Sequence, residues 1–160
     1  MASIILPQKL DEKLTRKAEA TYSLPEELAL KLILKGLNEE LDPEELAEHY
    51  RALSRKYLIE AKEFLKRGDT VQASEKFWGA SALAVKAVAA KRGLRLEKHG
   101  SLWDFMSKLS KESGDKDIVR FFSAANGLHR NFYEDEMTLE AIEIVAEDIE
   151  QLIARLERIP

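Results

Sequence analysis

The 160-residue sequence contains no cysteine, which excludes disulfide bonds, thiolate metal ligands and cysteine nucleophiles. Only seven glycines and four prolines are available for turns, so long loops are not expected. No run of about 18 apolar residues occurs, and the sequence therefore predicts no membrane span. The first six residues are too short for a signal peptide and carry no basic leader. We therefore expect a cytoplasmic protein.

The sequence also lacks an excess of positive charge. Its net charge is −4 at pH 7 and its pI is about 5.5, whereas chains that bind nucleic acid through their overall charge are strongly basic. Apolar residues make up 45% of the chain and charged residues 34%, which is enough apolar matter for a core and too much for a disordered chain. The length fits one domain, or one domain with a small appendage.

The spacing of apolar residues predicts one short extended segment and then seven helices. The extended segment is 3–6, and the helices are expected at about 11–22, 24–37, 43–67, 70–92, 101–113, 115–132 and 138–158. Ser23, with Glu26 three residues on, is expected to cap the second helix, and Asp42 and Asp69 the third and fourth. The predicted fold is all-α. It is an up-and-down antiparallel helical bundle over residues 42–160, with a strand and helical hairpin over residues 1–41 as an appendage.

The helix expected from Asp69 to Gly93 is apolar nearly all round between Ala73 and Ala90. Such an alanine-rich helix is typical of the middle of a bundle, where small side chains permit close approach. Lys86 interrupts it, and we expect that side chain to extend into solvent along its aliphatic stem. The alternative is that Lys76, Trp78 and Lys86 form part of an anion site.

The order of a strand, a helix, a Ser-Leu-Pro-Glu-Glu turn and a second helix in residues 3–41 resembles a ribbon-helix-helix unit. That unit is the dimeric DNA-binding module of many antitoxins, and its strands place polar side chains in the major groove. Here the strand Ser3-Ile4-Ile5-Leu6 offers no Arg, Asn, Gln or Lys, and the first such side chains are Gln8 and Lys9. The segment through Asp42 carries six basic and eight acidic residues. This composition disfavours DNA binding and favours a dimerising or docking hairpin.

The stretch from Asn126 to Glu134 gathers several reactive side chains on one predicted helix. Asn126, then His129 or Arg130, then Tyr133 follow one another at three or four residues and share a face beside an apolar stripe. A histidine can move protons near neutral pH, and a guanidinium can hold a phosphate. These residue types suit RNA cleavage without a metal, through activation of a ribose 2′-hydroxyl. The alternative is a histidine satisfied at the edge of the core.

A second cluster is His99-Gly100-Ser101-Leu102-Trp103. Its simplest interpretation is a helix start anchored in the core by Trp103, and the alternative places His99 at the mouth of the His129 cleft. The sequence has no glycine-rich phosphate loop, no histidine pair at metal-binding spacing and no Gly-x-Ser-x-Gly elbow. We therefore expect no metal and no cofactor.

Several blocks of the sequence together resemble the PaREP family (type one), largely archaeal proteins related to the HEPN superfamily. The blocks are YLIEAKEFL (57–65), QASEKFWGA (72–80), AVAAKRG (87–93), HGSLW (99–103) and ANGLHRNFYE (125–134). The resemblance spans about residues 43–156 and implies an up-and-down helical bundle, commonly a homodimer. Many HEPN proteins are metal-independent ribonucleases or toxins of toxin–antitoxin pairs, often with a nucleotidyltransferase partner.

The HEPN signature is an arginine followed four to six residues later by a histidine, at a cleft between two subunits. His129 matches the histidine. Ala124 stands where arginine is expected, while Arg120 lies nine residues upstream and Arg130 follows the histidine. Family members that lack the arginine are expected to bind rather than to cut.

The sequence therefore favours a binding or regulatory module over an enzyme. Its cleft near His129 is expected to accept a nucleotide, RNA or a partner protein. The expected ligand contacts are Asn126, Glu134, His99, Lys76, Trp78 and Lys86. The first alternative is a metal-independent endoribonuclease in which His129 acts with Arg130 and Tyr133. The second alternative is a structural or antitoxin-like assembly protein.

Overall fold

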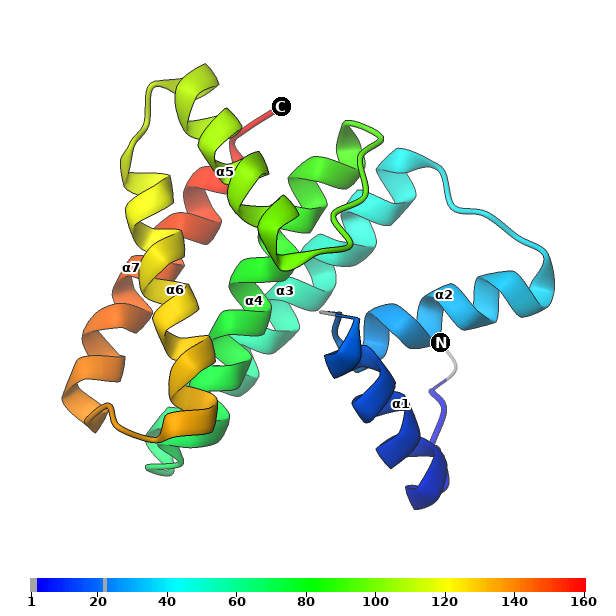
Figure 1. Ribbon diagram of the computed structural model, residues 1–160, viewed down its shortest axis with the longest axis horizontal. Helices are drawn as coiled ribbons and strands as arrows, with labels where there is room; N and C mark the ends of the chain where they lie inside the picture. The colour runs from blue at the N-terminus through cyan, green and yellow to red at the C-terminus, as the bar shows by residue number, and fades with distance from the viewer. Residues whose placement is uncertain (1–2, 22) are drawn as a thin grey trace. The chain divides into compact units, whose positions relative to one another are not determined.

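The computed structural model describes residues 3–21 and 23–160, apart from the side chains at positions 99 and 100. Over this range the chain is all-α, as the sequence predicts (Figure 1). Its helices are α1 (Gln8–Ala20), α2 (Pro25–Leu37), α3 (Pro43–Lys66), α4 (Thr70–Lys91), α5 (His99–Ser113), α6 (Asp117–Glu134) and α7 (Leu139–Glu157). None of them is both long enough and apolar enough to cross a membrane.

The strand expected over residues 3–6 is not confirmed, because residues 3–7 have no regular secondary structure. A strand is stable only when its backbone N–H and C=O groups pair with a neighbouring strand. The described part of the chain supplies no second strand for this pairing. Ile4 and Ile5 are instead exposed to 71% and 94%.

Helix starts follow the expected caps with one exception. The side chains of Asp42 and Asp69 accept backbone N–H groups three residues on, at 2.8 and 3.1 Å, and so begin α3 and α4. In α2 the capping residue is Leu24 rather than Ser23. The Glu27 carboxylate accepts the Leu24 N–H at 3.0 Å. The start of α2 therefore lies one residue later than the Ser23–Glu26 spacing predicts.

The chain divides into two compact units. Unit 1 comprises Met1–Leu41 with Glu97–His99. Within it α1 and α2 pack on each other, yet α2 contains no buried residue, and Ala18 is the one core residue among the described positions up to 41. Unit 1 is thus a helical hairpin with almost no core of its own.

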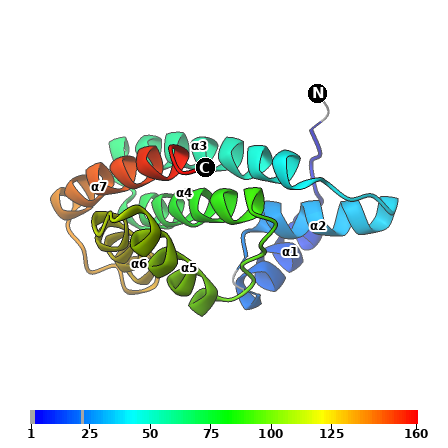
Figure 2. The same cartoon turned by 90° about the horizontal axis from the view of Figure 1, so that it is seen from above.

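Unit 2 comprises Asp42–Leu96 and Gly100–Pro160, and α4 is its central helix. Figure 2 shows α3 and α7 along one side of α4 and α5 and α6 along the other. Every residue from Phe77 to Ala90 is buried, which confirms the central position expected for this alanine-rich helix. The Ser54 hydroxyl on α3 donates to the Ala80 carbonyl at 2.7 Å, so these two helices approach closely.

Candidate functional site

The carboxyl-terminal half of α6 places a polar edge beside the core. Phe122, Ala125 and Leu128 face inward and are buried. His129 follows directly after Leu128 and is only half-buried, because one residue turns the helix by about 100°. The apolar stripe expected on this helix therefore fixes where the histidine emerges.

His129 lies in the seam between α6 and α4. Its ring stacks on Trp78 of α4 with ring centres 5.0 Å apart and a 30° angle between planes. Its Nδ1 lies 3.5 Å from Oε2 of Glu75, and both atoms are buried. The Tyr133 ring meets the histidine edge-on, with centres 5.6 Å apart. We call His129, Trp78, Glu75 and Tyr133 the His129 site.

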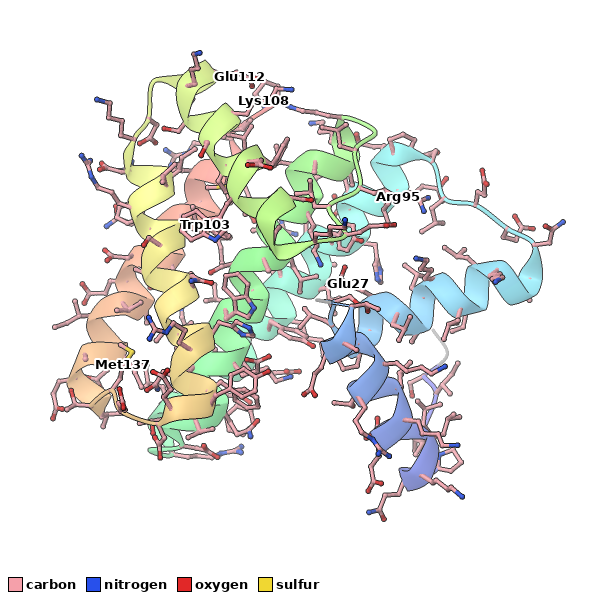
Figure 3. The ribbon with its side chains drawn as sticks, viewed as in Figure 1. Glu27, Arg95, Trp103, Lys108, Glu112 and Met137 are labelled. Atoms are coloured by element: carbon pink, nitrogen blue, oxygen red, sulfur yellow. The ribbon has the colours of Figure 1, made fainter. Side chains whose placement is uncertain are left out.

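The aromatic rings of the site continue into the core. Trp78 also contacts Phe122, with ring centres 5.6 Å apart, and Phe122 contacts Trp103 of α5 at 4.8 Å. Figure 3 labels Trp103 on α5, the third helix that contributes to this run of rings. Tilted and edge-on ring pairs are favourable and orientation-specific. The position of His129 is therefore set by the packing of three helices.

Asn131 holds the end of α6 in place although it is one of the buried polar residues of the core. Its amide Nδ2 donates to the Ser74 hydroxyl on α4 at 2.9 Å. Its Oδ1 accepts the backbone N–H groups of Glu136 and Met137 at 2.9 and 2.8 Å. One side chain thus ties α6 both to α4 and to the connection that leads to α7, where Figure 3 labels Met137.

An open hollow of about 250 Å³ lies beside this connection. Its lining residues are Gly127, Arg130, Asn131, Glu134, Glu136 and Met137. Two carboxylates and one guanidinium therefore face the hollow. It also lies at the carboxyl-terminal end of α6, which carries the negative end of the helix dipole. The electrostatic potential there favours positive charge.

The arginines that the sequence offers as phosphate clamps are paired with acids. Arg130 is largely exposed and lies 3.5 Å from Glu134, one turn further along α6. Arg120 donates to Asp117 at 2.6 Å near the start of α6. At a rise of about 1.5 Å per residue, the nine positions from Arg120 to His129 span about 13 Å along the axis.

The expected contacts on α4 do not share one face. Trp78 belongs to the His129 site. Lys76 instead points to α3, where its Nζ lies 2.7 Å from Glu60 and 4.1 Å from the centre of the Tyr57 ring. Lys86 is buried with 5% exposure, so the expectation that it reaches solvent is wrong. Lys86 lies within the buried run Phe77–Ala90 of α4.

The other expected contacts have different surroundings. Asn126 is half-buried on α6, one turn before Arg130, and Glu134 is exposed and paired with Arg130. His99 was also expected to contact the ligand, but its side chain lies outside the described part of the chain. Within the described part of the chain, no group of three or more His, Asp or Glu side chains lies close enough together to hold a metal ion.

Two residues of the site region are not singled out by the sequence. Glu75 precedes Trp78 by three positions on α4, so helical spacing places both on one face, and this signal could have identified it. Asn131 stands inside the Asn126–Glu134 stretch. Its role depends on Ser74, which is 57 residues away in sequence, and on the conformation of the connection after α6. No local pattern contains that information.

Fold and site together define an all-helical protein with a histidine held in an interhelical seam against a carboxylate. The chain belongs to the archaeal PaREP1/PaREP8 family, whose profile matches residues 49–153. The crystal structure of a protein from Sulfolobus solfataricus is similar, with a TM-score of 0.59 and 27% sequence identity. The similarity covers 65% of this chain and 92% of that protein. No curated protein matches the chain.

Proposed function

We propose that this chain is a HEPN-related binding module whose His129 site receives a positively charged segment of a partner protein. The observation that carries the proposal is the contact of His129 Nδ1 with Glu75 Oε2, on the face of Trp78. The His129 side chain is 26% exposed, and the Glu75 carboxylate lies beside its ring. Trp78 is buried, with 6% exposure, so a ligand at this position meets the imidazole, the exposed Tyr133 ring and the Glu75 carboxylate.

The surroundings of the site favour a cation for three reasons. Glu75 lies beside the imidazole, and Glu134, Asp135 and Glu136 follow Tyr133 in the sequence where α6 ends. The carboxyl-terminal end of that helix adds its own partial negative charge. The exposed ring of Tyr133 can attract an ammonium or guanidinium group, an interaction worth about 0.5–2 kcal/mol. A lysine or arginine side chain satisfies all three.

A nucleotide or RNA fits these surroundings less well, because a phosphate needs positive partners. Arg120, Arg130 and Lys76 are each paired with a carboxylate of the same chain. A phosphate at the His129 site would have to break one of these pairs and approach Glu75. Between the ligand classes that the sequence allows, the geometry therefore favours a protein partner.

The proposal is tested by nuclear magnetic resonance with three probes: a short lysine-rich peptide, AMP and a single-stranded RNA oligonucleotide. The side-chain N–H signal of Trp78 is expected to shift with the peptide at concentrations where AMP and RNA leave it unchanged. Glu75→Gln removes the acid and is expected to weaken peptide binding by about tenfold, which corresponds to loss of one partly buried charge pair.

Lys76→Met is the matched control, because that lysine lies on the same helix but faces Glu60 and Tyr57. It is expected to leave peptide binding unchanged. A Trp78 shift with AMP or RNA, and none with the peptide, would refute the proposal in favour of a phosphate-bearing ligand.

Ribonuclease activity is the second candidate, and the same histidine–carboxylate contact favours it. A carboxylate at Nδ1 can orient an imidazole so that its other nitrogen takes a proton from a ribose hydroxyl. The test is cleavage of a fluorogenic RNA in the presence of EDTA. Cleavage that His129→Ala abolishes and Glu75→Gln reduces would establish the enzyme. Under the binding proposal the wild type does not exceed the His129→Ala background.

A further inference from the structure

One side of α1 carries basic side chains and no acid. At about 100° per residue its members fall within an arc of about 100° around the helix: Lys9, Lys13, Arg16 and Lys17. We call this set the α1 basic face. All four side chains are exposed, and none of them lies within ion-pair distance of a carboxylate in the described part of the chain. The acids of α1 lie on its other sides: Asp11, Glu12 and Glu19. The α1 basic face therefore presents positive charge to solvent.

Exposed apolar side chains lie beside the α1 basic face. Leu10 is 51% exposed and lies only about 20° from Lys17 around the helix. Ile4 and Ile5 are largely exposed as well, and they precede Lys9 by five and four residues. Five residues of chain reach at most about 17 Å, so both isoleucines stay near the basic side chains. The surface around the start of α1 thus combines cations with apolar groups.

Positive charge beside exposed apolar side chains matches the surface of an anionic lipid bilayer. Lysine and arginine side chains contact the lipid phosphates, while apolar side chains enter the boundary between headgroups and acyl chains. The phosphate backbone of a nucleic acid offers partners for the cations only, and it would leave Ile4 and Ile5 in water. The net charge of −4 does not prevent the contact, because salt screens charges that are more than about 8 Å apart. The apolar neighbours therefore favour a lipid surface.

We propose that α1 and the segment before it dock on an anionic lipid surface. The α1 basic face lies on the headgroups, and Ile4 and Ile5 reach the boundary with the acyl chains. Docking leaves the hairpin intact, because Ala18, the buried residue of α1, lies about 180° around the helix from Lys9. The proposal concerns unit 1 and does not depend on the ligand of the His129 site.

The first test is sedimentation of the full chain with phosphatidylcholine vesicles that contain about 30% phosphatidylglycerol, alongside vesicles of phosphatidylcholine alone. The chain is expected to sediment with the anionic vesicles and to stay in solution with the neutral ones. Rising salt concentration is expected to release it, because the headgroup contacts are electrostatic. A wild type that stays in solution with anionic vesicles at low salt, or that binds both kinds equally, overturns the proposal.

Two variants test the two parts of the surface. Lys13→Gln removes one charge and is expected to weaken binding to anionic vesicles by about fivefold, which corresponds to about 1 kcal/mol. Ile5→Ser removes an apolar side chain and is expected to weaken it by at least about fivefold. Lys66→Gln and Ile59→Ser are the matched controls, since both residues are exposed on α3 of unit 2, and they are expected to bind like the wild type. Circular dichroism checks the helicity of each variant. Wild-type binding by either Lys13→Gln or Ile5→Ser refutes the proposed surface.

The same variants separate a lipid surface from a nucleic acid. Filter binding of a single-stranded RNA oligonucleotide, at the salt concentration of the vesicle experiment, is expected to show no complex. RNA binding that Lys13→Gln weakens and Ile5→Ser leaves unchanged, without binding to anionic vesicles, would assign the α1 basic face to a phosphate backbone instead.

Discussion

Asn131 connects α6, α4 and the following connection through three hydrogen bonds of one buried amide. Asn131→Ala removes all three bonds and leaves the backbone N–H groups of Glu136 and Met137 without their acceptor. We expect a loss of about 3 kcal/mol in the free energy of unfolding, because unsatisfied buried groups cost about 1–3 kcal/mol each and solvent replaces part of the loss. Urea denaturation measures this change.

Ser123→Ala is the control for this prediction, because Ser123 is exposed on the same helix. A change within about 0.5 kcal/mol is expected for it. An Asn131→Ala variant as stable as the control would show that the amide does not hold the end of α6.

At the scale of single residues, the sequence predicts where a side chain lies relative to the core better than it predicts which side chains it contacts. The apolar stripe of α6 places His129 at the border of the core, and the structure confirms this border position. The sequence does not reveal that the ring stacks on Trp78 and meets Glu75, since those contacts depend on how α4 and α6 are rotated about their axes. The same holds for Lys76, whose partner Glu60 lies on α3.

At the scale of helices, the close approach of α3 and α4 depends on small side chains. Ala80 is fully buried, and its carbonyl accepts the Ser54 hydroxyl. Ala80→Leu adds three carbon atoms where the two backbones are close together. We expect a loss of about 1–3 kcal/mol, as is usual when extra methylenes are forced into a packed core.

Thermal unfolding followed by circular dichroism measures the effect of Ala80→Leu. Ala52→Leu is its matched control, because Ala52 is exposed on α3 and tolerates a larger side chain. If both variants unfold at the wild-type temperature, α3 and α4 have more room between them than the Ser54–Ala80 hydrogen bond indicates.

A pH prediction follows from the start of α6. The hydrogen bond from Arg120 and the nearby Arg155 hold the pKa of Asp117 below its ordinary value of 3.8. A carboxylate with a lowered pKa in the folded state contributes stability that is complete above the ordinary value. That contribution is lost as the pH falls through the lowered one. Below about pH 4 the wild type is therefore expected to lose stability more steeply than Asp117→Asn.

Melting temperatures measured from neutral pH to about pH 2 test this prediction. Asp104→Asn, a change at an exposed position of α5, is the control and is expected to retain the wild-type steepness. Parallel pH profiles for the wild type and Asp117→Asn would contradict the role assigned to Arg120 and Arg155.

The helix boundaries show where the local sequence is sufficient to predict the structure. Asp42 and Asp69 cap as predicted because an N-cap needs only a side-chain oxygen and a helix that follows it. The start of α2 is displaced from Ser23 to Leu24, because Glu27 rather than Glu26 closes back on the chain. Glu26 and Glu27 are neighbours, so the sequence allows capping from either Ser23 or Leu24, and the local pattern does not distinguish the two.

At the scale of the whole molecule, the all-α class follows from residue spacing, and so does the central position of α4. The strand expected over residues 3–6 is not confirmed, because β-branched residues express only a local preference and a strand also needs a neighbouring strand to pair with. The two units differ in how many residues their helices bury. Unit 2 buries a continuous helix, Phe77–Ala90, whereas α2 of unit 1 buries no residue.

This difference predicts how fragments of the chain behave. A fragment Asp42–Pro160 contains nearly the whole described core and is expected to unfold cooperatively in urea, with the helical circular dichroism of a folded protein. A peptide Met1–Leu41 has helices of 13 residues each and one core residue among its described positions, and helices of that length are marginal in water. At low micromolar concentration it is expected to be largely unfolded. A fragment Asp42–Pro160 without cooperative unfolding, or a peptide that is fully helical and monomeric, would contradict this division of stability.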